Sequence, residues 1–299
     1  MKITVFTPTF NRAHILPKLY NSLLKQTNQN FEWLIVDDGS TDNSKTIIDE
    51  WIKQNRIVIK YFYQKNSGKM MAHNLGVLKS EEELFMCVDS DDYLFDENVI
   101  NKIITKWESV DNKEKETLSG IVAQRLIVNK GNKNIAIPNI YADTLSNLYS
   151  KYKFDGETAL IFRTKILKKH LFPHIEGEKF ITENYIYEQI DQQYKFLYYP
   201  TNCFTCEYMA DGYTVNWIKT VIKNPKGWKL YYLQHMKYCN STKDLIKTVY
   251  HYISISFIDK ENILNIISNS NNKILTLLLL PIGWIKSHKD KKLYKHLQK

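Results

Sequence analysis

Apolar and polar residues alternate in blocks along the first half of the chain, and the blocks differ in period. Four short apolar runs have the length of buried strands, and they lie at residues 2–6, 31–36, 57–63 and 84–88. Between them, apolar side chains recur at helical spacing at residues 15–24, 44–54 and 70–79. Alternating strands and helices predict an α/β fold, with a mostly parallel sheet flanked by helices on both faces.

The rest of the chain continues this pattern and then changes it. The predicted elements are a helix at 97–110, a charged loop at 111–117, strands at 120–128, 159–163, 194–199 and 203–209, and a basic helix ending at His170. From residue 216 onward the pattern is helical, as in the amphipathic stretch at residues 245–257. We therefore predict an α/β domain over residues 1–215 and a helical C-terminal appendage over residues 216–299.

Polar and acidic residues follow three of the predicted strands. Asp37 and Asp38 come directly after one apolar run, Asp89 and Asp91 come after another, and the first run leads into residues 7–12. Ligands of open α/β sheets bind beyond the carboxyl ends of the strands, so these residues are expected to share one crevice. In an isolated sequence each group could equally be an acidic turn that caps the next helix.

The acidic strand ends have the chemistry of a cation site. Alternate residues of an extended segment point the same way, so Asp89 and Asp91 can face one ligand. Carboxylate oxygens suit Mg²⁺ or Mn²⁺, and an ion held by one or two carboxylates takes its other ligands from phosphates. Residues 67–69 lack the features of a P-loop, and no Gly-x-Gly-x-x-Gly follows a predicted strand. Nucleotide binding would therefore depend on carboxylates and a metal ion.

Four motifs in order carry a resemblance to a known family. They are Thr7-Pro8-Thr9-Phe10-Asn11-Arg12, Val36-Asp37-Asp38-Gly39-Ser40-Thr41-Asp42, Asn66-Ser67-Gly68-Lys69 with Ala72 and Asn74, and Val88-Asp89-Ser90-Asp91-Asp92. Together they resemble the family 2 glycosyltransferases, which have the GT-A fold, a Rossmann-like arrangement of sheet and helices. The resemblance covers roughly residues 1–215 and does not specify a sugar.

The resemblance implies a site for a nucleotide-sugar donor, with a UDP-sugar favoured. The residues that it places around the donor are Thr7, Pro8, Thr9, Asn11, Arg12, Asp37, Asp38, Asn66, Gly68, Lys69, Asn74, Asp89 and Ser90. Asp91 would be the chief ligand of a Mn²⁺ or Mg²⁺ cofactor that bridges the diphosphate, with Asp89 beside it. Many relatives carry arginine at the position of His73, so a basic contact there is in doubt.

The resemblance also implies inversion by direct displacement, which needs a carboxylate base for the acceptor hydroxyl. Glu183 is the best candidate, because Asn184 replaces the Asp that is common next to it. A helix-start acid that interacts with the helix dipole is the alternative role for Glu183. Asp155 and Glu157 are candidates for the acceptor side, and Asp211 could close over the nucleotide.

Composition and charge narrow the class of partner. The net charge of +9 and the isoelectric point of about 9.1 suit an anionic partner such as a nucleotide or a membrane surface. The sequence has no helix-turn-helix, zinc-finger or RNA-recognition signature, so no nucleic-acid partner is predicted.

Cys203 and Cys206 form a Cys-x-x-Cys without a second pair, which favours structural thiols. The four cysteines suggest no disulfide framework, and with no signal peptide this predicts a cytoplasmic protein.

The C-terminal segment combines an apolar run with a basic cluster. Residues 274–285 are apolar, and six lysines follow between 286 and 299. Twelve helical residues span about 18 Å, which is shorter than the ~30 Å hydrocarbon core of a bilayer. Residues 274–299 therefore suit peripheral binding to the anionic inner face of the plasma membrane, close to a lipid-linked acceptor. The alternatives are a packed helix with solvated lysines, or a subunit contact in a homo-oligomer.

These observations predict a metal-dependent inverting glycosyltransferase of the hexosyltransferase type. It would move a sugar from a nucleotide-sugar to a glycan or lipid-linked acceptor in bacterial cell-surface polysaccharide synthesis. One alternative is a nucleotidyltransferase that makes a nucleotide-sugar, although residues 8–13 do not match its Gly-rich loop. A second alternative is a non-catalytic module that binds glycans or membranes, which has no need of the paired carboxylates.

Overall fold

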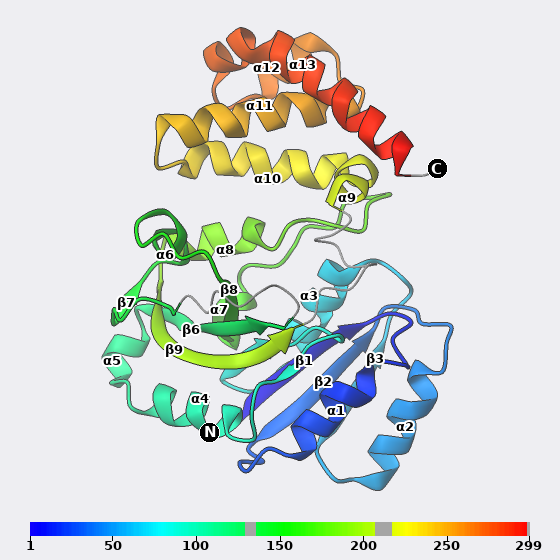
Figure 1. Cartoon of the computed structure of the whole chain (residues 1–299), viewed down its shortest axis with the longest axis vertical. Coiled ribbons are helices and arrows are strands. Elements are labelled where there is room, and N and C mark those ends of the chain that lie inside the picture. Colours follow the sequence, from blue (N-terminus) through cyan, green and yellow to red (C-terminus); the bar gives the residue numbers. More distant parts are fainter. Residues whose placement is uncertain (129–135, 207–216, 298–299) are drawn as a thin grey trace. The chain divides into compact units, whose positions relative to one another are not determined.

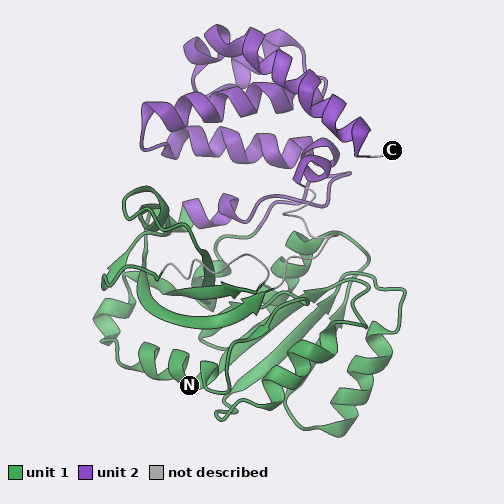
Figure 2. Ribbon diagram, viewed as in Figure 1, with its two compact units in different colours: residues 1–171, 189–209 green, residues 172–188, 210–299 purple. Residues whose placement is uncertain are grey.

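The computed structural model describes residues 1–128, 136–206 and 217–297. The chain divides into two compact units (Figure 2). The first unit comprises Met1–Leu171 with Gln189–Met209, and the second comprises Phe172–Glu188 with Ala210–Lys299. The predicted domain boundary at residue 215 lies outside the described residues, so it stays a prediction.

A single mixed sheet organises the first unit (Figure 1). Its strands are β1 (Ile3–Thr9), β2 (Phe31–Asp37), β3 (Ile59–Tyr63), β4 (Leu84–Cys87), β5 (Tyr93–Leu94), β6 (Leu118–Ile127), β7 (Ala142–Asp143), β8 (Glu157–Arg163) and β9 (Lys195–Cys206). Their order is β3-β2-β1-β4-β8-β6-β9-β5, and β7 pairs with β9. The strands β3, β2, β1 and β4 are all parallel, whereas β8 is antiparallel to both of its neighbours.

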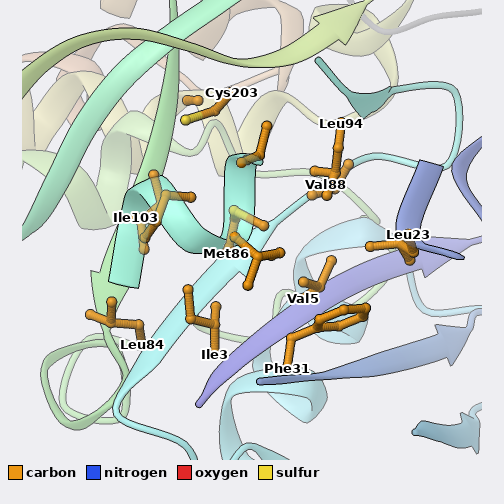
Figure 3. Packing of buried hydrophobic residues seen from close by; sticks show 14 of the residues in the cluster. Ile3, Val5, Leu23, Phe31, Leu84, Met86, Val88, Leu94, Ile103 and Cys203 are labelled. Atoms are coloured by element: carbon orange, nitrogen blue, oxygen red, sulfur yellow. The ribbon is translucent and has the colours of Figure 1, made fainter. Parts of the chain in front are cut away.

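Helices cover both faces of the parallel strands, as the alternation of elements predicted. The helices α1 (Leu16–Leu24), α2 (Ser44–Gln54) and α4 (Val99–Glu108) pack on one face, where they share a buried cluster with alternate strand residues such as Ile3 and Val5. Figure 3 shows these residues with Phe31 and Met86 from the neighbouring strands. The predicted mixed α/β class, with a mostly parallel central sheet and flanking helices, is therefore confirmed.

The helix α3 (Lys69–Lys79) packs against the other face at very short range. A Cβ atom added at Gly76 would lie 2.3 Å from the ring of Phe6, so only glycine allows this approach. Phe6 in turn stacks on Phe85, with ring centroids 5.0 Å apart, and meets His73 edge-on at 5.7 Å. This contact places the start of α3 next to the ends of the parallel strands.

The structure corrects three details of the predicted elements. Residues 194–199 and 203–209 were expected to be separate strands, but β9 is continuous, because register shifts against β6 accommodate the segment around Pro200. The charged loop at 111–117 contains the short helix α5 (Asn112–Lys115), whose N-terminus is capped by Asp111. The basic helix predicted to reach His170 is only the short α7 (Thr164–Leu167).

Helices make up the remaining elements. The helix α6 (Leu145–Ser150) lies between β7 and β8, and α8 (Asn184–Asp191) precedes β9. Five helices follow residue 216: α9 (Trp217–Lys223), α10 (Pro225–Tyr238), α11 (Thr242–Ile258), α12 (Ile263–Asn269) and α13 (Lys273–His296). A cluster of Met236, Val249, Tyr252, Ile253 and Ile266 forms the core of the second unit. Within the described ranges, every helix is too short or too polar to cross a bilayer.

A histidine bridged by two carboxylates joins the segments of the second unit. The Nδ1 atom of His235 lies 2.5 Å from Oε1 of Glu188, and its Nε2 atom lies 3.2 Å from Oδ2 of Asp244. Burial disfavours the charged imidazolium, but the hydrogen bond and charge of Glu188, together with Asp244, outweigh burial and raise the pKa of His235. The histidine therefore links α8, α10 and the start of α11 when it is protonated.

We predict that His235→Gln removes a pH-dependent part of the stability. A histidine whose pKa is raised in the folded state contributes its full stabilisation below the unfolded pKa of about 6.5. This stabilisation is lost as the pH rises through the folded pKa. The difference in free energy of unfolding between wild type and variant, measured by urea denaturation from pH 5 to 9, should therefore shrink as the pH rises.

The matched control is His251→Gln, because burial lowers the pKa of His251 to about 4. For that histidine the difference between wild type and variant should grow as the pH rises from about 4 to about 6.5. The same pH trend for both variants would contradict the assignment of the His235 pair.

Candidate functional site

Hydrogen bonds between loops bring the ends of β1 and β2 together. The backbone N–H of Asp38 donates to the carbonyl of Thr9 at 2.8 Å, which continues the pairing of the two strands. Beyond it, Asn11 adopts a left-handed conformation with φ of 53°, and its side-chain oxygen accepts from the N–H of Thr41 at 2.8 Å. The N–H of Asn11 donates to the hydroxyl of Ser40 at 2.9 Å. Two of the predicted motifs therefore form one local structure.

The carboxylate of Asp38 organises the loop before α3. Its Oδ1 accepts from the N–H of Ser67 and the side-chain amide of Gln64, both at 2.7 Å, and its Oδ2 accepts from the N–H of Gly68 at 2.9 Å. Each carboxylate oxygen can accept about two hydrogen bonds, so Oδ2 keeps capacity for a ligand. The carboxylate of the preceding residue, Asp37, accepts a hydrogen bond from the N–H of Ser40 at 2.7 Å.

Two glycines allow these loops to approach each other. Gly39 has φ of +85°, and a Cβ atom there would lie 2.8 Å from the backbone nitrogen of Asn66. Gly68 has φ of +94° directly before the first turn of α3. Side chains at either position would strain the backbone, and at Gly39 would also push the loops apart. The conformation of the second and third motifs therefore requires both glycines.

A lysine and an arginine neutralise the acidic end of β4. The Nζ atom of Lys69 lies 2.9 Å from Oδ1 of Asp89, and the guanidinium of Arg125 lies 2.9 Å from Asp92 and 4.0 Å from Asp89. Burial alone would raise the pKa of Asp89, but the charges of Lys69 and Arg125 hold it below its ordinary value. Asp89 is therefore ionised and paired with cations of the protein itself.

Asp91 differs from its neighbours because its charge is not balanced in this way. Its carboxylate makes no hydrogen bond or ion pair with another residue in the part of the chain that the structure describes. Burial, followed by the negative charge of Asp89, raises the pKa of Asp91. A carboxylate in this situation gains most from a cation supplied by a ligand, so Asp91 and Asp89 fit a divalent ion.

The sequence patterns did not identify Arg125, which lies near the end of β6. A single arginine within an otherwise largely apolar strand was the available signal, because a charge at such a position is normally paired. Its partner Asp92 is the last residue of the fourth motif. Burial raises the pKa of Asp92 to about 7, the ion pair with Arg125 works against this shift, and the charges of Asp89 and Asp91 add to it.

The other predicted donor residues occupy different surroundings. Thr7 is fully buried, and its hydroxyl accepts from the indole N–H of Trp33 at 2.9 Å. Thr9 and Ser90 are also buried. Pro8, Arg12, Asn66 and Asn74 lie on the same strand ends and loops or on α3. All of these assignments to the donor stay predictions.

The surroundings of His73 exclude a basic contact from this position. His73 is buried between Phe6 and Phe85 on the inner face of α3. Burial, with the charge of Lys69 adding to it, lowers the pKa of His73 to about 3. The side chain is therefore a neutral part of the core at physiological pH.

The candidates for the acceptor side lie in several segments. Glu183 directly precedes α8 and belongs to the second unit, whereas Asp155 and Glu157 belong to the first unit. Asp155 is exposed, and Glu157 begins β8, where it is the register partner of Arg125. Asp211 lies outside the described residues. The role of each of these carboxylates stays a prediction.

The fold is that of an α/β protein, and its candidate ligand site lies at the carboxyl ends of the parallel strands, among carboxylates, a lysine and two glycine-dependent loops. The model of one family, glycosyl transferase family 2, matches residues 4–209. The chain belongs to this family.

Relatives and solved structures agree with the assignment. The chain is 28% identical over 199 residues to the glycosyltransferase GlyG of Streptococcus pneumoniae, and the match covers 60% of this chain and 62% of GlyG. The chain thus spans less than two thirds of that relative's length.

Two solved structures share the fold. The complex of S. aureus TarS 1-349 with UDP-GlcNAc has a TM-score of 0.59 and 18% identity, covering 97% of this chain and 89% of TarS. The mannosyltransferase PcManGT of Pyrobaculum calidifontis, in complex with GDP-Man and Mn²⁺, has a TM-score of 0.55 and 14% identity, covering 99% and 84%. At these identities the comparison shows the GT-A fold alone.

We predict that Arg125→Met destabilises the first unit by about 3 kcal/mol at pH 8, because it leaves the buried carboxylate of Asp92 without its cation, whereas Asp89 keeps Lys69. Adding Asp92→Asn should restore part of that loss, because the unpaired charge is then removed. Urea denaturation of wild type, both single variants and the double variant measures the coupling. Purely additive effects would contradict the proposed pairing.

Proposed function

We propose that this chain is a metal-dependent inverting glycosyltransferase that moves a hexose from a UDP-sugar to a glycan or lipid-linked acceptor. The observation that carries the proposal is the unbalanced carboxylate of Asp91 beside the Asp89–Lys69 pair, at the carboxyl ends of parallel strands. This group of charges suits a metal-bound diphosphate, which brings a cation for Asp91 and anionic oxygens for Lys69.

The donor would bind along the loops after β1 and β2 and before α3. Asp38 keeps acceptor capacity on Oδ2 for N–H or O–H groups of the base and ribose, as Asp37 does to a smaller extent. Gly68 lets the backbone approach the nucleotide closely. The nucleotide-sugars in the structures of TarS and PcManGT support this class of donor, with UDP favoured by the likeness to TarS.

Asp91 and Asp89 would hold the divalent ion, Mn²⁺ or Mg²⁺. When bound, such an ion neutralises the charge that develops on the departing nucleoside diphosphate. The Mn²⁺ in the PcManGT structure supports this cofactor. Lys69, whose ammonium group lies 2.9 Å from Asp89, would bind the diphosphate.

Glu183 would act as the base. A direct displacement inverts the anomeric carbon, and the attacking hydroxyl needs a proton acceptor on the side opposite the leaving diphosphate. The place of Glu183 directly before α8 supports this role, since a residue in a connection can be aimed into a site that the helix itself does not occupy.

The acceptor and the location of the enzyme complete the proposal. We propose cell-surface polysaccharide synthesis at the inner face of the plasma membrane, with the protein bound peripherally and self-association as an additional property. The basic C-terminal helix supports this location, because its exposed lysines attract anionic lipid.

The first test is Asp91→Asn. UDP with Mn²⁺ should raise the melting temperature of the wild type more than UDP alone, and the variant should lose this metal-dependent part. Transfer should fall by at least ~100-fold. Folding should be unaffected, since the carboxylate bonds to no other described residue. Asp49→Asn, on the outer surface of α2, is the control. A metal-dependent shift that survives Asp91→Asn would disprove the metal site.

The second test is Glu183→Gln. Donor binding should be intact, so the melting-temperature shift with UDP and Mn²⁺ should equal that of the wild type. Transfer to acceptor should fall by about 100-fold or more, which is the range for loss of a general base. Glu176→Gln, an exposed acid of the same segment, should transfer normally. Normal transfer by Glu183→Gln would instead direct attention to Asp155, Glu157 or Asp211.

A further inference from the structure

The outward face of α13 is apolar over half of its length. The exposed large side chains recur three or four residues apart, which places them on one side of the helix: Ile274, Leu277, Leu278, Ile282 and Ile285. Their exposed fractions range from 48% for Ile285 to 77% for Ile274. A contiguous apolar stripe of this kind usually marks a surface that binds something.

The fully buried positions of the same helix are small or polar residues, and Leu275, Leu279 and Leu280 pack beside them against the core of the second unit. Gly283 packs against Ile253 so closely that a Cβ atom would lie 2.5 Å from its Cγ2. Thr276 is hydrogen-bonded to Ser270 at 2.7 Å, and Asp290 accepts from Ser254 at 3.1 Å. The inward side of α13 is therefore complete without the exposed apolar residues, which lie outside these contacts. Packing of the second unit does not explain the apolar stripe.

The apolar stripe continues as a basic stripe toward the C-terminus. Lys289 and Lys292 follow Ile285 by four and seven residues, so they lie on the same side of the helix, and both are exposed, as is Lys295. The single acid of α13, Asp290, is buried and paired with Lys286 at 2.7 Å. The outward face thus carries positive charge without a neighbouring carboxylate from its own helix.

A tryptophan lies where the two halves meet. Trp284 is 49% exposed, and its ring lies 4.2 Å from that of His288. Indole rings favour the boundary between hydrocarbon and headgroups, because they have an apolar body and a polar N–H group. The helix therefore presents, along one side, an apolar segment, an aromatic boundary and a row of lysines.

We propose that this face of α13, from Ile274 to Lys295, docks on an anionic bilayer with the helix axis parallel to the membrane plane. Its apolar half enters the outer part of the hydrocarbon layer, and its lysines bind anionic headgroups. The inference deepens the proposed function by naming the membrane-binding surface, and it rests on that function for its biological role. The helix has 24 residues and is about 36 Å long, so its apolar half and its basic half can both lie on the membrane surface, one after the other along the axis.

A bilayer suits this face better than a second copy of the chain. Two copies packed antiparallel would place the lysines of one on the apolar half of the other, and two packed parallel would bring the lysines together. Both arrangements leave positive charge without an anion. Anionic lipid supplies hydrocarbon and negative charge to the same face at once.

The test is co-sedimentation of the full chain with phosphatidylcholine vesicles, with and without 30% phosphatidylglycerol. The wild type should bind the anionic vesicles and bind them less in high salt. Leu278→Glu with Ile282→Glu should weaken binding at least tenfold, and Leu78→Glu, an exposed leucine of α3, should not. Lys289→Gln with Lys292→Gln should weaken binding and flatten its salt dependence, whereas Lys243→Gln with Lys247→Gln on α11 should not.

The outcomes separate this proposal from the proposed function. Each variant is also tested for its melting-temperature shift with UDP and Mn²⁺, which should match the wild type. Equal binding of all variants, or no binding of the wild type to anionic vesicles, would overturn the docking surface while leaving the donor site standing. Dimerisation that Leu278→Glu with Ile282→Glu abolishes, without vesicle binding by the wild type, would assign the face to a second copy instead. Vesicle binding without any UDP shift would uphold the surface and reject the transferase.

Discussion

The site depends on how negative charge is balanced at the carboxyl ends of β2 and β4. Backbone N–H groups of the neighbouring loops satisfy Asp37 and Asp38, and the cations of Lys69 and Arg125 satisfy Asp89 and Asp92. The partners of Asp38 and Asp89 lie at the start of α3 and that of Asp92 lies in β6, so the balance of charge also holds these segments in place. Asp91 is left over: among the described residues no cation pairs with it, and burial together with the charge of Asp89 raises its pKa.

Close approach of backbones makes this arrangement possible. Gly39 and Gly68 let the loops after β2 and before α3 meet, and Gly76 lets α3 lie directly on Phe6. The helix then delivers Lys69 from its first turn to Asp89. The neutral His73 fills the space behind that lysine, where a second positive charge would have to be buried without a partner. Core packing and site electrostatics are therefore consequences of the same short contacts.

Local patterns predicted much of the fold. The bounds of α2 match the predicted 44–54, because an apolar face at helical spacing is a local property of the sequence. The continuity of β9 was missed, since a proline within a strand is tolerated only when the partner strand shifts its register, and the partner lies far away in sequence. Arg125 was missed for the same reason: its partners Asp89 and Asp92 lie more than 30 positions earlier in the chain.

The chain alone was enough to recognise the family resemblance, the four motifs and most of the strands and helices, because these features depend on the period of apolar residues and on short runs of polar ones. It also showed an apolar run followed by lysines at the C-terminus. Two features follow only from the folded chain: which carboxylate lacks a cation, and which side of α13 faces outward. Both depend on contacts between distant segments: the approach of β6 to the end of β4, and the packing and hydrogen bonds that hold the inward side of α13 on the core of the second unit.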